Sequence, residues 1–288
     1  MINLKPCLYA YSALLISFAS STSPLHAETL PVIDTHIHYS HDAWDMLPPA
    51  KAVQILKDAG LKKALVSSSS DEGTQRLYQA APDLIVPVLR PYRKRGELST
   101  WFKDTSVIEL LSNRLKHHTY AGIGEFHIFG DDANLPVMQA VVKLAAKYKI
   151  FLHAHADAKA VRNLFQQDPN ARILWAHSGF ESPDIIDEML GQYPNLSADL
   201  AFRYEHEING ELDPQWRALF NKYPQRFMIG TDTYAPERWY YVIDHADWSR
   251  TWLNTLPNEL KQNIAYNNAH ALIQWALADK NINQATTD

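Results

Sequence analysis

Short apolar runs alternate with amphipathic stretches along most of this chain, and this alternation limits the folds it can adopt. From Pro31 onward, runs rich in Val, Ile and Leu are followed by stretches whose apolar residues recur at helical spacing, as in residues 136–149. This rhythm is typical of βα units, which build parallel sheets. We count eight runs, so the sequence predicts an α/β protein with one (β/α)8 TIM barrel. The predicted strands are VIDTHIH, KKALVSSS, LIVPVLRPY, AGIGEFHIF, KIFLHAHA, RILWAHSG, NLSADLAFR and FMIGTDTY.

The N-terminal segment differs in composition from the rest of the chain. It contains Lys5, an apolar stretch from Cys7 to Ala19, and a small, polar stretch that ends at Ala27. This order is typical of a secretory signal peptide, and the apolar stretch is shorter than the ~20 residues that a membrane span needs. An uncleaved membrane anchor is the alternative. We therefore expect a signal peptide over residues 1–27, a barrel domain over residues 28–288, and a periplasmic or secreted protein.

Charge and cysteine content narrow the classes of partner. The chain has 27 basic and 32 acidic residues, a formal net charge of −5, and no basic tract. A nucleic-acid surface or an anionic membrane surface is therefore not indicated, and we expect no stable membrane insertion after signal removal. Cys7, the only cysteine, lies in the predicted signal peptide, so the mature chain would form no disulfide. The expected partner is a small-molecule substrate, and the sequence gives no indication of an oligomeric state.

Histidines lie at the ends of three predicted strands. His36 and His38 are two residues apart in the first strand and therefore share a face, while His153 and His177 end the fifth and sixth strands. Asp232 follows the eighth strand, which becomes the neighbour of the first when a barrel closes. Each histidine alone could be a structural core residue, and Asp232 could cap a helix. Burying several imidazoles without partners is costly, however, so the set predicts a metal site.

Further polar residues lie at or near strand ends. Glu125 follows small glycines on the fourth strand, where an inward carboxylate can bridge two ions. His155 shares a face with His153, so it could line the substrate pocket or replace that ligand. We expect Arg90, Arg203 and His127 to bind an anionic group of the substrate. The alternative role of the two arginines is to form salt bridges at the barrel rim. The candidate substrate-binding residues are Arg90, His127, His155 and Arg203.

The ordered motifs DTHIH, IFLHAH, WAHSG and IGTD resemble the first, fifth, sixth and eighth strand motifs of the amidohydrolase superfamily. The resemblance covers roughly residues 31–278. The segment IAYNNAHAL is similar to the end of many members of the amidohydrolase-2 branch, and Glu125 gives the chain some TatD-like character. The resemblance implies zinc or another divalent metal, held by His36, His38, His153 and Asp232.

The same resemblance leaves the number of ions open. In members with two ions, Glu125 and His177 would also be metal ligands. In members with one ion, the histidine of the sixth strand is instead catalytic, which assigns His177 and Asp232 as the catalytic pair. One ion and two ions both remain possible interpretations of the sequence.

A bound metal ion suggests a mechanism, because it lowers the pKa of water from about 15.7 towards about 7. Asp232 would accept the water's proton during attack on a carbonyl or phosphoryl centre, and His177, if it is not a ligand, would stabilise the oxyanion. We therefore predict a metal-dependent hydrolase that acts on an ester, lactone, amide or phosphoester bond. The nearest alternative is a metal-dependent non-oxidative decarboxylase of the same branch. A non-catalytic periplasmic ligand-binding barrel would be expected to lack these two groups.

Overall fold

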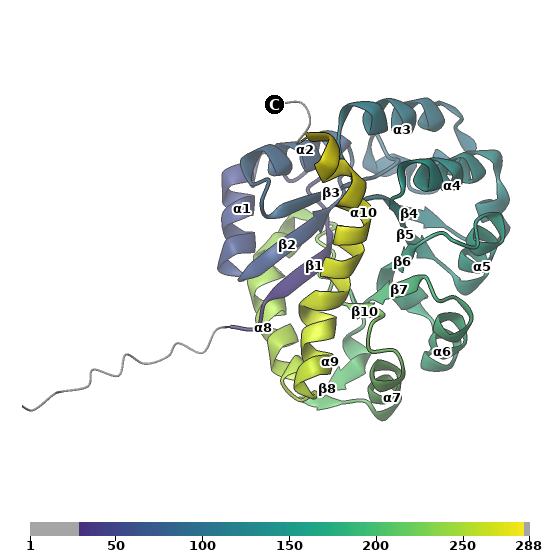
Figure 1. Ribbon diagram of the computed structural model, residues 1–288. Helices are drawn as coiled ribbons and strands as arrows, with labels where there is room; N and C mark the ends of the chain where they lie inside the picture. The colour runs from purple at the N-terminus through teal and green to yellow at the C-terminus, as the bar shows by residue number, and fades with distance from the viewer. Residues whose placement is uncertain (1–28, 285–288) are drawn as a thin grey trace, which may run out of the picture.

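The computed structural model describes residues 29–284, with side chains to residue 278, and forms a (β/α)8 barrel (Figure 1). Eight parallel strands follow one another in chain order around the sheet, which confirms the predicted fold class. The predicted signal peptide, residues 1–27, lies outside the described residues. The barrel strands are β1 (Val32–Ile37), β2 (Leu61–Val66), β3 (Ile85–Leu89), β4 (Gly122–Ile128), β5 (Phe151–Ala156), β6 (Ile173–Trp175), β7 (Leu196–Asp199) and β10 (Phe227–Met228).

A helix follows each barrel strand, as the amphipathic stretches predicted. After the last barrel strand, η6 (Pro236–Tyr241), α8 and α9 precede the closing helix. A two-stranded hairpin, β8 (Glu207–Ile208) and β9 (Glu211–Leu212), follows β7 and was not predicted. The helices are α1 (Pro49–Asp58), α2 (Asp71–Ala80), α3 (Ser106–His117), α4 (Pro136–Tyr148), α5 (Ala158–Gln167), α6 (Pro183–Gln192), α7 (Pro214–Lys222), α8 (Val242–Leu253), α9 (Asn258–Gln262) and α10 (Asn268–Gln284).

Backbone hydrogen bonds between the first strand and the segment after the last strand bring the two ends of the sheet together. Thr35 N donates to Ile229 O at 2.9 Å, and Asp232 N donates to His36 O at 2.7 Å. Strand β10 has only two residues, so the chain beyond it, and not a regular strand, carries Asp232 beside β1.

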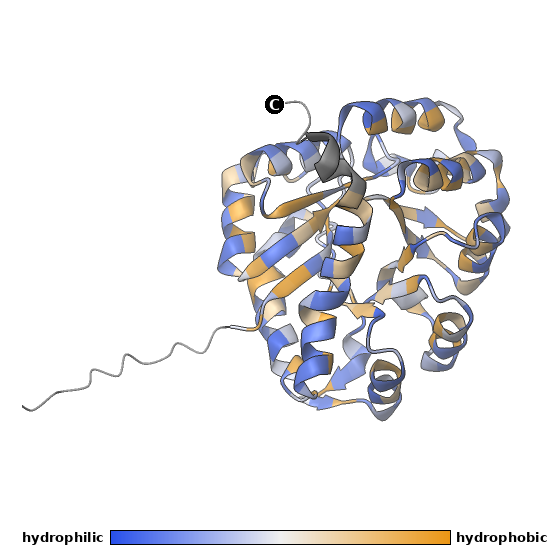
Figure 2. Cartoon of the chain, viewed as in Figure 1, coloured by the Kyte–Doolittle hydropathy of each residue, from blue (hydrophilic) through white to orange (hydrophobic). Residues whose placement is uncertain are grey.

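The core has two parts, and one of them closes an end of the barrel. Most buried apolar side chains lie between the strands and the surrounding helices, and Figure 2 shows mainly hydrophobic strands among helices of mixed hydropathy. A second cluster joins strand residues such as Ile33 and Phe151 to Leu272 and Ile273 of α10. Helix α10 therefore covers the end at which the strands begin (Figure 1). In residues 29–284, no helix is both long and apolar enough to span a membrane.

Candidate metal centre

Most of the polar strand-end residues meet at the opposite end of the barrel. A cavity of about 250 Å³ opens there. Its lining includes Arg90, Glu125, His155, His177 and Asp232, which come from five different strand ends or the loops that follow them. This position is where catalytic groups lie in TIM-barrel enzymes.

Two histidines of β1 present free ring nitrogens to one point. His38 Nδ1 lies 2.6 Å from the carbonyl oxygen of Ser67, which can only accept, so the ring proton is on Nδ1. His36 Nδ1 lies 3.0 Å from Asp199 Oδ2 and is held in the same tautomer. His36 Nε2, His38 Nε2 and Asp232 Oδ1 are buried and lack hydrogen-bond partners among the described residues. Ligand atoms of these three residues lie within 4.8 Å of one another, which suits a metal ion.

Glu125 lies beside these atoms and connects them to a second group of side chains. Its Oε2 is 3.2 Å from His38 Nε2 and 2.7 Å from Arg90 Nη2, while its Oε1 is 2.9 Å from His155 Nδ1. The preceding Gly124 has φ 134°, and a Cβ there would lie 2.1 Å from the carbonyl oxygen of His153. Only glycine allows β4 to approach β5 this closely, so this residue sets the position of the Glu125 carboxylate.

The electrostatics of the centre favour a bound cation. Burial alone would raise the pKa of Asp232 and Glu125, but nearby imidazoles hold the pKa of Asp232 at about 2 and that of Glu125 well below its ordinary value. Burial alone would lower the pKa of His36, but Asp232, Glu125 and Asp199 raise it well above its ordinary value. The surrounding carboxylates therefore stabilise positive charge at this point, carried by a second proton on His36 in the metal-free protein and by the ion when one is bound, so the donor set fits a divalent metal ion.

Asp232 reaches the centre through an unusual backbone conformation. Its φ is 52°, in the left-handed region, which costs a residue other than glycine roughly 1–3 kcal/mol. Its N–H bonds to His36 O, and Arg238 Nε donates to its carbonyl at 2.6 Å. These bonds hold the carboxylate with Oδ1 towards His38 at 3.3 Å and Oδ2 towards His177 Nε2 at 3.8 Å.

His153 lies next to the centre, but its Nε2 faces Asp199 and not the three unpartnered atoms. The distance from His153 Nε2 to Asp199 Oδ2 is 3.1 Å. Burial tends to raise the pKa of Asp199, but His36 and His153 lower it well below its ordinary range. The ionised carboxylate accepts, so the ring proton of His153 is on Nε2. In this orientation Nε2 of His153 is bonded to Asp199, and the role of His153 as a metal ligand stays a prediction.

Asp199 at the end of β7 was missed by the sequence analysis. It is buried, and its Oδ1 accepts from the backbone N–H groups of His177 and Ala201 at 2.9 and 3.0 Å. A polar residue in a predicted barrel strand was the signal that identified the histidines. The same signal could have identified Asp199, because it is the only acidic residue in the predicted strand NLSADLAFR.

His177 lies in η4 (Ala176–Phe180), where residues 177–179 all have positive φ. Gly179 is required in this turn, since a Cβ would lie 2.1 Å from the Trp175 ring. His177 Nδ1 is 3.0 Å from the carbonyl oxygen of Ala201, which leaves the Nε2 lone pair directed towards Asp232 and Glu125. Arg203 donates to the carbonyls of His177 and Glu181 and does not line the cavity. Its observed contacts support the turn, while its predicted role in substrate binding stays a prediction.

The remaining predicted substrate-binding residues line one wall of the cavity. The rings of His127 and His155 stack with centroids 4.1 Å apart, and Arg90 is paired with Glu125. Burial is the main cause that lowers the pKa of His127, to about 3, so this ring is neutral at neutral pH. Ligand atoms of Glu125, His127 and His155 also lie within 4.8 Å of one another.

Comparison with known proteins supports the fold but identifies no family. No protein-family model matches this sequence, and no curated protein matches it. An uncharacterised TIM-barrel protein from Bordetella bronchiseptica aligns with a TM-score of 0.59 and 13% identity, over 86% of this chain and 99% of its own. A protein named as a 2-pyrone-4,6-dicarboxylic acid hydrolase from Pseudomonas putida gives a TM-score of 0.59 and 12% identity, over 85% and 98%. An amidohydrolase from Burkholderia multivorans gives 0.54 and 11%, over 84% and 98%.

Proposed function

We propose that this protein is a metal-dependent hydrolase that uses metal-activated water on an ester, lactone, amide or phosphoester bond of a small molecule. The observation that carries the proposal is the convergence of His36 Nε2, His38 Nε2 and Asp232 Oδ1, three buried polar atoms without hydrogen-bond partners. Leaving such atoms unpaired is costly, and a metal ion would satisfy all three. Two of the structurally similar proteins named above are hydrolases by name, which supports the same reaction class.

His36, His38 and Asp232 would hold the ion, with Glu125 Oε2 beside them at 3.2 Å from His38 Nε2. Imidazole nitrogens with carboxylate oxygens suit zinc, and we propose zinc or a similar divalent metal. When bound, the ion would lower the pKa of a water molecule and polarise the oxygen of the bond that is cleaved.

Asp232 and His177 are placed to move protons. Asp232 is ionised at neutral pH, and its Oδ2 faces the cavity side where His177 lies. We assign Asp232 as the group that accepts the proton of the attacking water and returns it to the leaving group. Neutral His177 has its ring proton on Nδ1, bonded to Ala201, so its Nε2 accepts and does not donate. His177 can therefore stabilise an oxyanion only after it has taken up a proton.

The charge of the centre favours one ion over two. The buried carboxylates of Glu125, Asp199 and Asp232 surround the centre, and the guanidinium of Arg90 pairs with Glu125. One divalent ion would balance the two negative charges that remain. The ligand atoms of Glu125, His127 and His155 favour the alternative of a second ion. A second divalent ion would, however, leave the centre with a net positive charge beside Arg90.

Apolar side chains in the lining of the cavity indicate that the substrate has an apolar part. Two of the exposed large hydrophobic residues, Phe180 and Tyr234, line this cavity. Exposed apolar surface of this kind often marks a binding site.

Metal analysis combined with a panel of ester, lactone, amide and phosphoester substrates tests the proposal. We expect about one zinc ion per chain, and hydrolysis that chelation abolishes and added zinc restores. Asp232→Ala should lower kcat by about 100-fold or more, because a proton-transfer group typically contributes that much. Asp187→Ala, on the exposed side of α6, is the matched control and should retain activity. Activity that survives both chelation and Asp232→Ala would contradict the proposal.

We also propose export of the protein, on the basis of its first 27 residues. Cellular fractionation with N-terminal sequencing tests this, and a mature chain that begins at Glu28 is the expected result. Recovery of the uncleaved chain from the cytoplasm would contradict it.

A further inference from the structure

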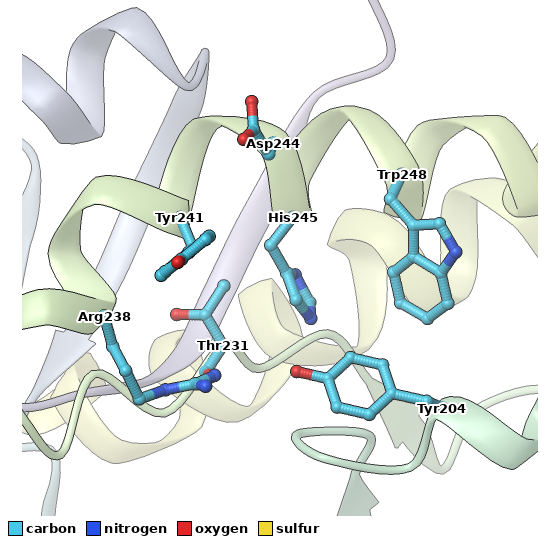
Figure 3. Close-up of a pocket in the computed structure, with 7 residues that line it drawn as sticks. All are labelled: Tyr204, Thr231, Arg238, Tyr241, Asp244, His245 and Trp248. Carbon is cyan, nitrogen blue, oxygen red and sulfur yellow. The ribbon is translucent and has the colours of Figure 1, made fainter.

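A second cavity, of about 370 Å³, lies beside the metal centre and shares none of its lining residues. We propose that it binds a small neutral aromatic compound, at a site separate from the metal centre. The cavity lies between the segment after β10, the helices η6 and α8, and the short helix η5 (Tyr204–His206) (Figure 3). Its lining consists of Tyr204, Thr231, Arg238, Tyr241, Asp244, His245 and Trp248.

Aromatic rings form most of the cavity wall. The Tyr204 and Trp248 rings meet edge to face with centroids 5.6 Å apart, and Figure 3 shows Tyr241 on the opposite side of the space. Tyr204 is 45% exposed and Tyr241 is 61% exposed, so both rings leave apolar surface in water. An aromatic guest would cover these rings and gain edge or stacking contacts with them. A cavity of about 150 Å³ holds benzene, so this larger space suits one ring or two fused rings.

The charged groups at the cavity sum to no net charge, which favours a neutral guest. Arg238 lies against one side, with its guanidinium hydrogen-bonded to the carbonyls of Asp232 and Thr231, and Asp244 carries the opposite charge. His245 adds no charge at neutral pH, because burial and Arg238 lower its pKa to about 4. A lining without net charge does not offset the cost of removing an ion from water.

Polar groups at the cavity favour a guest that also forms hydrogen bonds. Figure 3 shows the Tyr204 hydroxyl directed towards the space between Thr231 and His245. His245 Nδ1 is 3.4 Å from Ser249 Oγ, and its Nε2 is buried without a hydrogen-bond partner among the described residues. A guest with a hydroxyl or N–H group, such as a phenol or an indole, would pair with these groups.

A single layer of side chains separates this site from the metal centre. The Arg238 guanidinium stacks on Phe202 at 4.2 Å and lies 5.6 Å from the centroid of Tyr234. Phe202 and Tyr234 line the cavity of the metal centre, whereas Arg238 lines the aromatic cavity. A guest would therefore contact the side chain that holds the carbonyl of Asp232, but its binding does not depend on a metal ion.

Titration of the metal-free protein with indole and with phenol tests the site, with calorimetry and ligand-observed NMR as readouts. We expect saturable binding of one molecule per chain, and weaker binding of cyclohexanol, which has a hydroxyl but no aromatic ring. Tyr241→Ala should weaken indole binding by about five- to tenfold, as expected for loss of an aromatic contact. Tyr240→Ala is the matched control, because Tyr240 is adjacent, 58% exposed, and directed towards Lys51, outside the cavity.

A third variant separates the two cavities. Phe180 is 55% exposed and lines only the cavity of the metal centre, so Phe180→Ala should leave indole binding unchanged. The proposal is overturned if indole shows no saturable binding, if cyclohexanol binds equally well, or if Tyr240→Ala weakens binding as much as Tyr241→Ala. Loss of binding in Phe180→Ala would also overturn it, because the probe would then lie at the metal centre. None of these results depends on the proposed hydrolase activity.

Discussion

Asp199→Asn should reduce metal affinity although Asp199 is not among the atoms that would contact the ion. Its Oδ2 accepts from His36 Nδ1 at 3.0 Å and from His153 Nε2 at 3.1 Å, and its Oδ1 accepts from the backbone N–H groups of His177 and Ala201. The carboxylate thereby fixes the His36 tautomer whose Nε2 lone pair faces the candidate metal site. A carboxylate that orients a ligating histidine in this way is a common support of metal sites.

The substitution offers the amide two orientations, and both are unfavourable. If the amide nitrogen faces the imidazoles, His36 must accept at Nδ1, which moves its proton to Nε2 and blocks the metal ligand. If the amide oxygen faces the imidazoles, the nitrogen meets the backbone N–H groups of His177 and Ala201 and leaves two buried donors unpaired. An unpaired buried donor costs about 1–3 kcal/mol, and loss of an orienting carboxylate typically lowers metal affinity by about 10–100-fold.

Competition with a chromogenic chelator measures the zinc affinity, and urea unfolding measures the free energy of unfolding of the metal-free protein. We expect Asp199→Asn to bind zinc about 10–100-fold more weakly and to unfold at lower urea concentration. Asp187→Asn, a surface acid paired with Lys222, is the matched control and should leave zinc affinity unchanged. A variant that binds zinc within about threefold of the unmodified protein would refute the tautomer argument.

Two further predictions test the side-chain orientations. His38→Asn should lower zinc affinity by at least about 100-fold, whereas His153→Asn should lower it by about tenfold at most, because His153 Nε2 faces Asp199; a larger effect at His153 would make it a ligand. His206 is buried with its pKa lowered to about 4, mainly by burial, while a histidine in the unfolded chain titrates near 6.5. Unfolding therefore takes up a proton at this residue. The free energy of unfolding falls for this reason by up to about 3 kcal/mol as the pH falls from about 6.5 towards 4. His206→Phe should remove this part of the pH dependence in urea unfolding, and an unchanged slope would contradict the assigned pKa.

The fold could be predicted from the sequence because its signals are local and repeat. Most barrel strands are short runs rich in apolar residues, and the amphipathic stretch that follows faces the barrel with its apolar side. The hairpin β8–β9 escaped prediction because its strands have two residues each, too few for an alternating pattern. The short strand β10 shows the same limit, since RFMIGTDTY gives an apolar run that continues beyond the two residues that pair with β7.

The candidate site could be predicted in its composition and in its place at the strand ends, but not in its contacts. The positions of His36, His38 and Asp232 follow from strand spacing and barrel closure. The orientation of His153 depends on its hydrogen bond to Asp199, a residue of another strand. No local sequence pattern encodes the distance between these two side chains. Arg203 also shows that contacts are not encoded locally. Its position after β7 suggested a contact with the substrate, while its guanidinium bonds to backbone carbonyls at the η4 turn.

The tautomers of the four central histidines, which the sequence does not encode, divide them by role. His36, His38 and His177 each have Nδ1 hydrogen-bonded to a fixed acceptor, namely Asp199, the carbonyl of Ser67 and the carbonyl of Ala201. Their Nε2 atoms therefore present lone pairs to the centre. His153 is reversed, since its Nε2 bonds to the same Asp199 oxygen as His36. In His36, His38 and His177 the acceptor bonded to Nδ1 leaves Nε2 facing the centre, which makes these three rings candidate ligands. His153 instead contacts, through Nε2, the carboxylate that fixes His36, and its role as a metal ligand stays a prediction.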